Sequence, residues 1–370
     1  MSKGRVIGIR HRVKKSTEGE PLPTQVAISE NGDINVAKLP DEDAELDFVK
    51  NGLQAGDKVA MVLGGSGDRL AFALSRQGEG IGAAVFRVPP FVLNKRRKRE
   101  REEDAITLAE LFLAEPGLFY EAKPRDRHLI LLRLALDART EAMKARIACE
   151  QRLRQGLIGQ IFCNPKGLYP EGKLEQIFDD QKASDVILQA LAAEEKKREA
   201  ELIRVVKSFD VFQIIFQPVE GCGPRIAAGI IAAVQDIRRF ATSAQLKKFF
   251  GVHVMDDGSF VRRRHGQVAS WNPAARQALF LLGDQFAKWR PNSLWGKKFQ
   301  ENKAKLRAAH PQVLCKQCGK PKPECKIKSH TSIYSDGHIH KMATWRTLSQ
   351  FVVWLHRQWW KLEEAEVVKS

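Results

Sequence analysis

Three cysteines and one histidine near the C-terminal end have the types and spacing of a small metal site. Cys315 and Cys318 are separated by two residues, Cys325 follows after six more, and His330 after another four. Thiolate sulfurs and an imidazole nitrogen in this number suit a tetrahedral zinc ion. We expect a structural zinc knuckle with all four positions filled by the protein. The alternative is a surface loop with free cysteines, because only one ligand pair has the tight Cys-x2-Cys spacing.

The fourth ligand of the zinc site has competing candidates. His338 or His340 could replace His330.

No run of 18 apolar residues occurs and the first 15 residues lack the apolar core of a signal peptide, so we expect a cytoplasmic protein without a membrane partner. A reducing compartment also suits the remaining cysteines better than a disulfide framework does, since they are scattered at Cys149, Cys163 and Cys222.

The chain is strongly basic. It carries 61 Lys+Arg against 44 Asp+Glu, a formal net charge of +17, and such an excess attracts polyanions. We therefore expect nucleic acid as a partner. The charge is densest where six of seven consecutive residues are basic, which we interpret as a phosphate contact and alternatively as an ordinary solvated face. These six residues are Lys95, Arg96, Arg97, Lys98, Arg99 and Arg101.

A second candidate contact is the segment GCGPR, which runs from Gly221 to Arg225 ahead of residues rich in alanine and glycine. The pattern predicts a hairpin between two helices, of the helix-hairpin-helix kind, in which amides at a helix start meet a phosphate. We expect Gly221, Gly223 and Arg225 to contact the nucleic-acid backbone there. The alternative is that the two glycines only let two helices pack closely.

Residues 218–251 and 258–280 carry a family resemblance. The segments PVEGCGPRIAAGIIAAVQDIRRF, SAQLKKFFG and GSFVRRRHGQVASWNPAARQALF resemble the C-terminal domain of the insertion-sequence 110 transposases. In that family a G-x-G-P segment, a helix ending in D-I-R-R-F, a later L-x-x-F/Y-x-G and an N-P-x-x-R signature recur, and Asn272, Pro273 and Arg276 fall on the last of these. The resemblance implies DNA transposition or recombination, with DNA and a structured guide RNA as partners and with assembly into homo-oligomers.

The resemblance also implies a nucleophile. In the family a serine just before a basic run is taken to join covalently to DNA, and Ser259 is the residue that lines up. A serine hydroxyl needs a base or a cation to activate it. Phe260 and Val261 stand where the family has glycines, so a turn serine without a catalytic role is the alternative. The activating neighbours would be Arg262, Arg263, Arg264 and His265.

The family's N-terminal domain resembles the Holliday-junction resolvase RuvC and uses four carboxylates to bind Mg²⁺. In this sequence Arg10 stands at the first position, Val62 or Leu63 at the second, and Arg101 at the third, so that only Asp104 remains. Mg²⁺ is therefore expected only if substitute ligands complete the site. Such substitutes would be Asp68, Glu102 or Glu103.

The missing carboxylates have two explanations. One hypothesis is that Arg10 and Arg101 place guanidinium groups where the metal ions would sit, so that a phosphate binds there without being cleaved. The other is drift in a decayed transposase copy. Function is therefore predicted as a transposase-like DNA-binding protein whose metal site is largely lost. The alternatives are a catalytically inactive, transposase-derived nucleic-acid-binding protein and an RNA scaffold.

The elements that must position these residues follow from periodicity. Short β-like runs at 5–10, 25–30 and 34–39 precede a helix at 41–53, a strand at 58–63, a helix at 69–76 and a strand at 83–88, which is the order of a ribonuclease-H-like fold. Helical apolar spacing at 125–158 and 174–206 predicts two long helices in an antiparallel arm.

These elements together predict an α/β plus α fold class with four parts. We expect a RuvC-like α/β domain at 1–112, a helical coiled arm at 113–210, a helical DNA-binding domain at 211–300, and a Cys/His segment with a terminal Trp-rich helix at 301–370.

Overall fold

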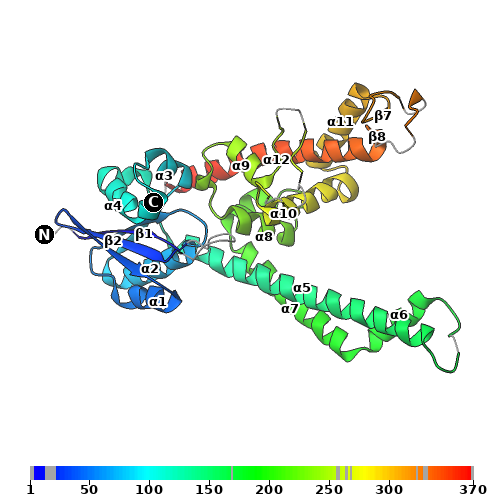
Figure 1. The fold of residues 1–370 in the computed structure, drawn as a ribbon, viewed down its shortest axis with the longest axis horizontal. Helices are drawn as coiled ribbons and strands as arrows, with labels where there is room; N and C mark the ends of the chain where they lie inside the picture. Colours follow the sequence, from blue (N-terminus) through cyan, green and yellow to red (C-terminus); the bar gives the residue numbers. More distant parts are fainter. Residues whose placement is uncertain are drawn as a thin grey trace. The chain divides into compact units, whose positions relative to one another are not determined.

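The structure, a computed structural model, describes residues 4–12, 22–167, 170–255, 259–262, 266, 269–321, 324–327 and 332–367. The chain divides into two compact units (Figure 1), each built from separate stretches of sequence. The sheet unit contains Met1–Ile130, Val234–Pro273 and Leu348–Ser370, and the arm unit contains Leu131–Ala233 and Ala274–Thr347.

The sheet unit contains one six-stranded sheet with the strand order β3-β2-β1-β4-β5-β6. β1 pairs antiparallel with β2 and parallel with β4, and β4 pairs parallel with β5. The predicted order of strands and helices in the first 88 residues is confirmed. The strands are β1 Val6–Arg10, β2 Thr24–Glu30, β3 Asp33–Leu39, β4 Lys58–Val62, β5 Ala84–Val88 and β6 Tyr120–Glu121.

Helices cover both faces of this sheet (Figure 1), because successive side chains of a strand point to opposite faces. Ile7 and Ile9 pack with Leu70 and Phe72 of α2 on one face, while Val6 packs on the other face in the cluster that contains α4. The helices are α1 Glu42–Asn51 and α2 Asp68–Ile81 on the first face, and α3 Pro90–Arg96 and α4 Asp104–Ala114 on the second.

Gly8 allows α4 to lie directly on β1. A Cβ atom at this position would stand 2.0 Å from the carbonyl oxygen of Ala105 and 2.7 Å from the backbone nitrogen of Ala109. Both atoms belong to the backbone of α4 and cannot rotate away. The absence of a side chain at Gly8 therefore fixes the depth at which α4 packs, and with it the position of Asp104 at the start of α4.

C-terminal segments complete the sheet unit. They are η4 Ile237–Arg239, α9 Ser243–Phe250 and the last part of α12 Asp336–Val367. The carbonyl oxygen of Phe240 lies 2.9 Å from Nε2 of His356 and accepts a hydrogen bond from Nε1 of Trp360 at 3.1 Å. Trp359 is 2 % exposed, as expected for an aromatic residue that packs in a core.

Two long helices run antiparallel in the arm unit (Figure 1), namely α5 Pro124–Phe162 and α7 Val186–Lys207. Glu195 of α7 accepts hydrogen bonds from Arg139 and Arg146 of α5 at 3.0 and 2.6 Å. The second predicted helix is divided, because α6 Leu174–Ser184 ends just before Asp185. The Asp185 carboxylate accepts from the Leu188 amide at 2.7 Å and so caps α7 as a new helix.

The arm unit also contains the shorter elements of the C-terminal half. They are η3 Phe212–Phe216, α8 Pro224–Val234, α10 Pro273–Asp284, η5 Gln285–Trp289, α11 Leu294–Ala309, and the two short paired strands β7 Leu314–Cys315 and β8 Ser332–Ile333. Within the part of the chain that the structure describes, none of the helices has the length and apolar character needed to span a bilayer.

Substituting Gly8→Ala is expected to lower the free energy of unfolding by about 3 kcal/mol, because the added methyl group meets immovable backbone. Gly80→Ala is the matched control, since nothing lies within 4 Å of a Cβ atom there. Gly80 is an exposed helical residue of α2, so this change should raise the free energy of unfolding by about 1 kcal/mol. Urea denaturation measures both, and equal stabilities of the two variants would contradict the close packing.

Candidate nucleic-acid interface and metal centre

Arg10 ends β1 at the carboxyl edge of the sheet. Its side chain is buried, with the residue 7 % exposed. The guanidinium donates to Oε1 of Gln25 at 3.3 Å and to the carbonyl oxygen of Pro23 at 3.1 Å. Burial lowers the pKa of Arg10, and the nearby negative charges of Asp104 and Glu102 oppose this shift. Arg10 is thus a fixed cation close to the acidic start of α4.

Asp104 is held by Arg97, which is neither of the two arginines that the sequence hypothesis placed at the metal positions. Nε and Nη2 of Arg97 donate to the two carboxylate oxygens of Asp104 at 2.7 and 2.8 Å. Arg97 also donates to Oδ1 of Asn94 at 2.7 Å, and hydrogen bonding to Asp104 raises the pKa of Arg97. Both carboxylate oxygens of Asp104 are therefore engaged in a bidentate ion pair. Arg101 is exposed at the start of η1 Arg101–Glu103.

The possible substitute ligands do not gather around Asp104. Asp68 is 3 % exposed and accepts from the Gly64 amide at 3.0 Å, and burial raises the pKa of Asp68. Val62 packs among apolar side chains, and both Glu102 and Glu103 are exposed. In the described ranges, ligand atoms of three or more His, Cys, Asp or Glu residues converge only at the cysteine cluster.

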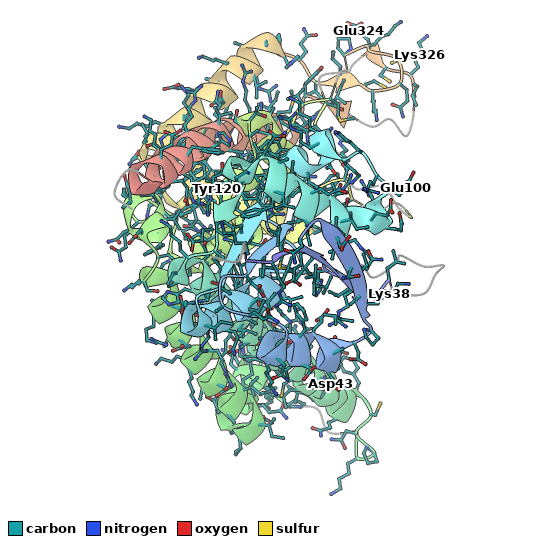
Figure 2. The ribbon with its side chains drawn as sticks, turned by 90° about the vertical axis from the view of Figure 1, so that its left-hand side faces the viewer. Lys38, Asp43, Glu100, Tyr120, Glu324 and Lys326 are labelled. Carbon is teal, nitrogen blue, oxygen red and sulfur yellow. The ribbon has the colours of Figure 1, made fainter. Side chains whose placement is uncertain are left out.

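Half of the basic run is neutralised within the sheet unit. Arg96 pairs with Glu115 at 2.9 Å, Arg97 with Asp104, and Arg99 with Glu110 at 2.8 Å. The remaining three basic side chains are exposed, as is Glu100 at the outer surface of this segment (Figure 2). These three exposed cations, which we call the open basic group, are Lys95, Lys98 and Arg101.

The D-I-R-R-F motif forms a buried ion-pair network. Arg238 donates to both oxygens of Asp236, with Nε 2.9 Å from Oδ1 and Nη2 2.6 Å from Oδ2. Its guanidinium carbon lies 4.6 Å from the ring centroid of Tyr120. Burial alone would raise the pKa of Asp236, but the Arg238 charge reverses the shift and lowers it. Arg238 also lies 3.9 Å from Asp126, which accepts from Arg87 at 2.7 Å. The motif therefore fastens this segment to the sheet unit.

Ser259 is an exposed residue of the sheet unit. Its carbonyl oxygen accepts from the Met255 amide at 2.8 Å, and Val254 pairs with Phe260 as an isolated bridge. Arg262 is exposed. Three of the residues expected to activate Ser259 lie outside the described residues, namely Arg263, Arg264 and His265.

Most of the remaining candidate contacts have local partners. Gly221 has a φ of +89°, and a Cβ atom there would stand 2.9 Å from Cβ of Gln285, which favours a packing role, whereas Gly223 has nothing within 4 Å. Arg225 is exposed and lies 3.3 Å from Glu199. The Asn272 amide donates to the carbonyl oxygen of Phe249 at 2.9 Å. Arg276 lies 4.6 Å above the Trp345 ring, and burial lowers its pKa.

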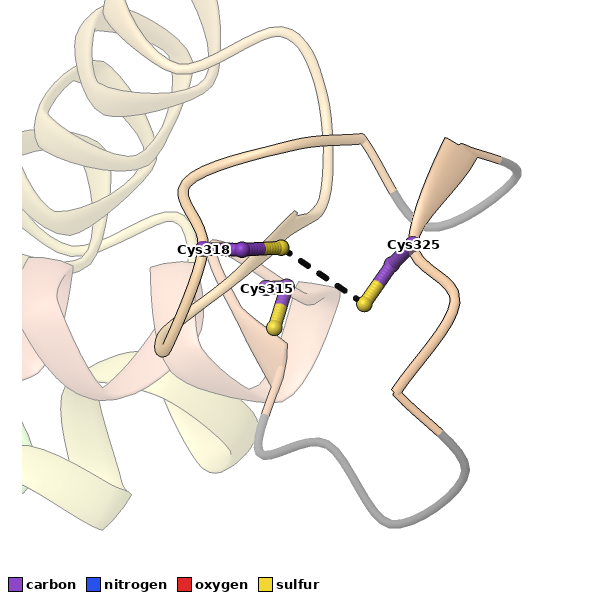
Figure 3. A group of neighbouring side chains, drawn as sticks. All are labelled: Cys315, Cys318 and Cys325. Atoms are coloured by element: carbon purple, nitrogen blue, oxygen red, sulfur yellow. Dashed lines mark hydrogen bonds between the residues drawn. The ribbon is translucent and has the colours of Figure 1, made fainter.

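The fold brings the sulfur atoms of the three predicted cysteine ligands close together. The sulfur atoms of Cys315, Cys318 and Cys325 lie within 4.8 Å of one another, with 3.6 Å between Cys318 and Cys325 (Figure 3). Tetrahedral bonds of about 2.3 Å to zinc place two sulfurs about 3.8 Å apart, so the cluster fits this ion. Gly319 makes the turn after Cys318, with a φ of +71° and a hydrogen bond from its amide to the Cys315 carbonyl at 2.9 Å.

The competing fourth ligands have other contacts. Nδ1 of His338 accepts from the Tyr334 amide at 2.9 Å, and its ring stacks on Tyr334. The His340 ring packs against Phe299 at 5.1 Å. His330 lies outside the described residues.

Several of these contacts were missed by sequence reasoning. The Arg97–Asp104 pair, the Arg238–Asp126 contact and the Arg276–Trp345 stacking join residues that no spacing rule connects. The available signal was the D-I-R-R-F motif, in which an acid lies two residues before the first of two bases and so suggests a local ion pair.

Asp236→Asn is expected to lower the free energy of unfolding by about 3 kcal/mol at pH 7, because Arg238 then stays buried without its charge partner. Glu110→Gln breaks an exposed pair with Arg99 and should leave stability nearly unchanged. The lowered pKa of Asp236 means that its stabilisation is lost as the pH falls below the ordinary value of 3.8, so the difference from wild type should shrink there. Chemical denaturation against pH measures this, and a pH-independent difference would contradict the ion-pair account.

Comparison with known proteins finds a family resemblance in one segment of the C-terminal half. Residues 214–299 match the model of the transposase family described as IS116/IS110/IS902. The search of curated proteins returns no match. The matched residues include the Gly221 turn, the D-I-R-R-F network, Ser259 and Arg276, so the resemblance expected from these motifs is confirmed. This segment of the chain is therefore similar to the IS116/IS110/IS902 family of transposases.

Proposed function

We propose that this chain is a transposase-like DNA-binding protein of DNA transposition or recombination, whose α/β site no longer binds a catalytic metal. The observation that carries the proposal is the bidentate pairing of Arg97 with Asp104, in a chain whose family match is to transposases. Mg²⁺ prefers negatively charged oxygen ligands. The single remaining carboxylate has both oxygens engaged, and Arg10 adds a fixed positive charge nearby.

Charge supports nucleic acid as the partner. The chain has a formal net charge of +17, and the open basic group faces solvent next to ion-paired arginines that hold its backbone in place. Cations of this kind bind phosphates and release counterions, which gives salt-sensitive affinity. We propose DNA as the main partner, with a structured guide RNA and a second copy of the chain as further partners.

The domain assignments extend this proposal. We propose that residues 1–112 form a RuvC-like domain, 113–210 a coiled arm, 211–300 a helical DNA-binding domain with a helix-hairpin-helix-like turn, and 301–370 the Cys/His segment and terminal helix. The parallel pairing of β1 with β4 and of β4 with β5 supports the first of these. We also propose a cytoplasmic location, which fits the free cysteines of the chain.

A second candidate function is an active transposase that uses Ser259 as its nucleophile and Asp104 as one metal ligand. The exposed position of Ser259 favours it, because a nucleophile must be reachable by DNA. This function requires Arg97 to release Asp104 when DNA and Mg²⁺ bind.

A nucleic-acid binding assay tests the first proposal. Replacing Lys95, Lys98 and Arg101 together by alanine should weaken DNA binding and reduce the slope of log affinity against log salt by roughly one unit for each lost phosphate contact. Lys144, Lys196 and Lys197 on the arm are exposed and provide a control triple variant of equal charge loss. Equal weakening by the two triples would mean that only net charge matters and would contradict a specific phosphate contact.

A cleavage assay separates the two candidates. Supercoiled DNA that carries the element's own ends is incubated with the protein, its co-purified RNA and Mg²⁺. We expect DNA binding without any strand cleavage that depends on Mg²⁺, Ser259 or Asp104. Cleavage that is abolished by both Ser259→Ala and Asp104→Ala would instead establish the active transposase.

We further propose that Cys315, Cys318, Cys325 and His330 hold a structural zinc ion. The sulfur separations and the turn at Gly319 support three of these ligands, and the contacts of His338 favour His330 as the fourth. The ion would cross-link the turn to the short β7–β8 pair and supply no catalytic chemistry, because all its positions are taken by protein ligands.

Metal analysis tests the zinc proposal. The purified chain should contain one zinc per molecule, Cys318→Ser should lose it, and Cys163→Ser should keep it, since Cys163 is an exposed cysteine outside the cluster. His330→Ala should weaken zinc binding more than His338→Ala. Full zinc retention by Cys318→Ser would contradict the site.

A further inference from the structure

Ser66, His11 and Glu45 form a chain of polar contacts in the sheet unit. All three residues lie outside residues 214–299, the segment that matches the family model. Nδ1 of His11 lies 3.0 Å from Oγ of Ser66, and Nε2 of the same ring lies 3.5 Å from Oε1 of Glu45. Exposure falls along the chain: Ser66 is exposed, the His11 side chain is 15 % exposed, and the Glu45 side chain is 11 % exposed. A reachable hydroxyl is thus connected through an imidazole to an enclosed carboxylate.

Three elements bring these groups to one edge of the sheet. His11 follows the end of β1, Ser66 lies in the turn between β4 and α2, and Glu45 lies on the inner side of α1. Because β1 and β4 are parallel neighbours, their carboxyl ends meet at the same edge. The turn before Ser66 contains Gly64 and Gly65 with φ values of +85° and +90°, a backbone that other residues rarely adopt.

The carboxylate and the imidazole are held in place. Glu45 accepts a hydrogen bond from Oγ1 of Thr24 at 2.5 Å and another from Arg12 at 3.0 Å. The Arg12 amide in turn donates to the Thr24 hydroxyl at 2.9 Å, which fixes the backbone next to His11. A base that is oriented by a third group and touches a hydroxyl is the arrangement that activates a serine.

The protonation state of His11 suits a base. Burial lowers its pKa, Glu45 and Glu42 of α1 raise it, and Arg12 lowers it. The net shift is downward, so the ring is neutral at pH 7 and can take up a proton.

We propose that Ser66 is a nucleophile for phosphodiesters, with His11 as its general base and Glu45 as the positioning residue. Oγ of Ser66 attacks phosphorus while its proton passes to His11, so that an O–P bond to Ser66 forms. The bond from phosphorus to one sugar oxygen breaks, and this oxygen leaves with the proton that His11 gives back. No metal ion or redox partner is needed for this balance.

The choice of a phosphodiester rests on the proposed function, because nucleic acid is the substrate class that it supplies. The surroundings of Ser66 add support. Arg69 is exposed in the first turn of α2. Positive charge at a helix start favours a bound phosphate.

Labelling with a fluorophosphonate tests the nucleophile without any DNA. The probe should modify Ser66 in the full-length chain, as located by peptide mass spectrometry, and His11→Gln should slow this labelling roughly 100-fold. Ser66→Ala should abolish it, whereas Ser259→Ala should not change it. Labelling of Ser66 no faster than that of other exposed serines would overturn the proposal.

The pH dependence of labelling tests the role of Glu45. The rate should rise with pH through the lowered pKa of His11 and reach a plateau by pH 7. Glu45→Gln should shift the midpoint to lower pH, since the Glu45 charge raises the pKa of His11, and should lower the plateau. An unmoved midpoint would overturn the assignment of Glu45 as the group that acts through His11.

A duplex of random sequence with one 5′-bridging phosphorothiolate tests the substrate class. The sulfur leaves readily and does not rejoin, so attack by Ser66 traps a protein–DNA adduct that forms in EDTA and is absent in Ser66→Ala. Labelling of Ser66 by the probe together with DNA binding but no adduct would overturn the phosphodiester assignment. Labelling without any DNA binding would overturn both this assignment and the proposed function, while leaving the activated serine established.

Discussion

The close contact between α4 and β1 is the constraint on which the carboxyl edge of the sheet depends. Gly8 has no side chain, and the backbone of α4 occupies the space that a Cβ atom would need. This contact places Asp104 beside the end of β1 and within the electrostatic range of Arg10. It also fixes the segment before α4, from which Arg97 reaches back to Asp104. A helix packed even one methyl group further out would separate these charges.

Arginine serves two purposes in the sheet unit. Arg87, Arg97 and Arg238 are enclosed and paired with carboxylates, and because breaking a buried pair leaves an uncompensated charge, they hold segments together. The open basic group, by contrast, faces solvent and is available to phosphates. The D-I-R-R-F motif, which resembles one in transposases, belongs to the first group of arginines. Its Asp236 and Arg238 fasten a C-terminal segment onto the sheet, which is a structural and not a catalytic role. A basic composition thus contributes internal cross-links as well as exposed positive charge.

The sequence predicts some of these features and not others, for physical reasons. Alternating apolar residues and turn glycines predict the strands and helices of the first 88 residues, because these signals act over neighbouring residues. The three cysteines were also predictable, since a Cys-x2-Cys pair brings its sulfurs together through one turn. The division of the second arm helix at Asp185 was not foreseen, because the apolar spacing continues across it. The Arg97–Asp104 pair and the Ser66–His11–Glu45 contacts depend on how separate elements pack, and no local pattern encodes that.

We propose that Arg97 and Arg10 occupy the place of a metal ion at Asp104. The most direct measurement is an isothermal titration of Mg²⁺ into the full-length protein, repeated with Asp104→Asn. We predict no Mg²⁺ binding at millimolar concentrations in either protein, because both oxygens of Asp104 are already paired. Binding by the wild-type chain that disappears in Asp104→Asn would contradict the account and show that the carboxylate remains a metal ligand.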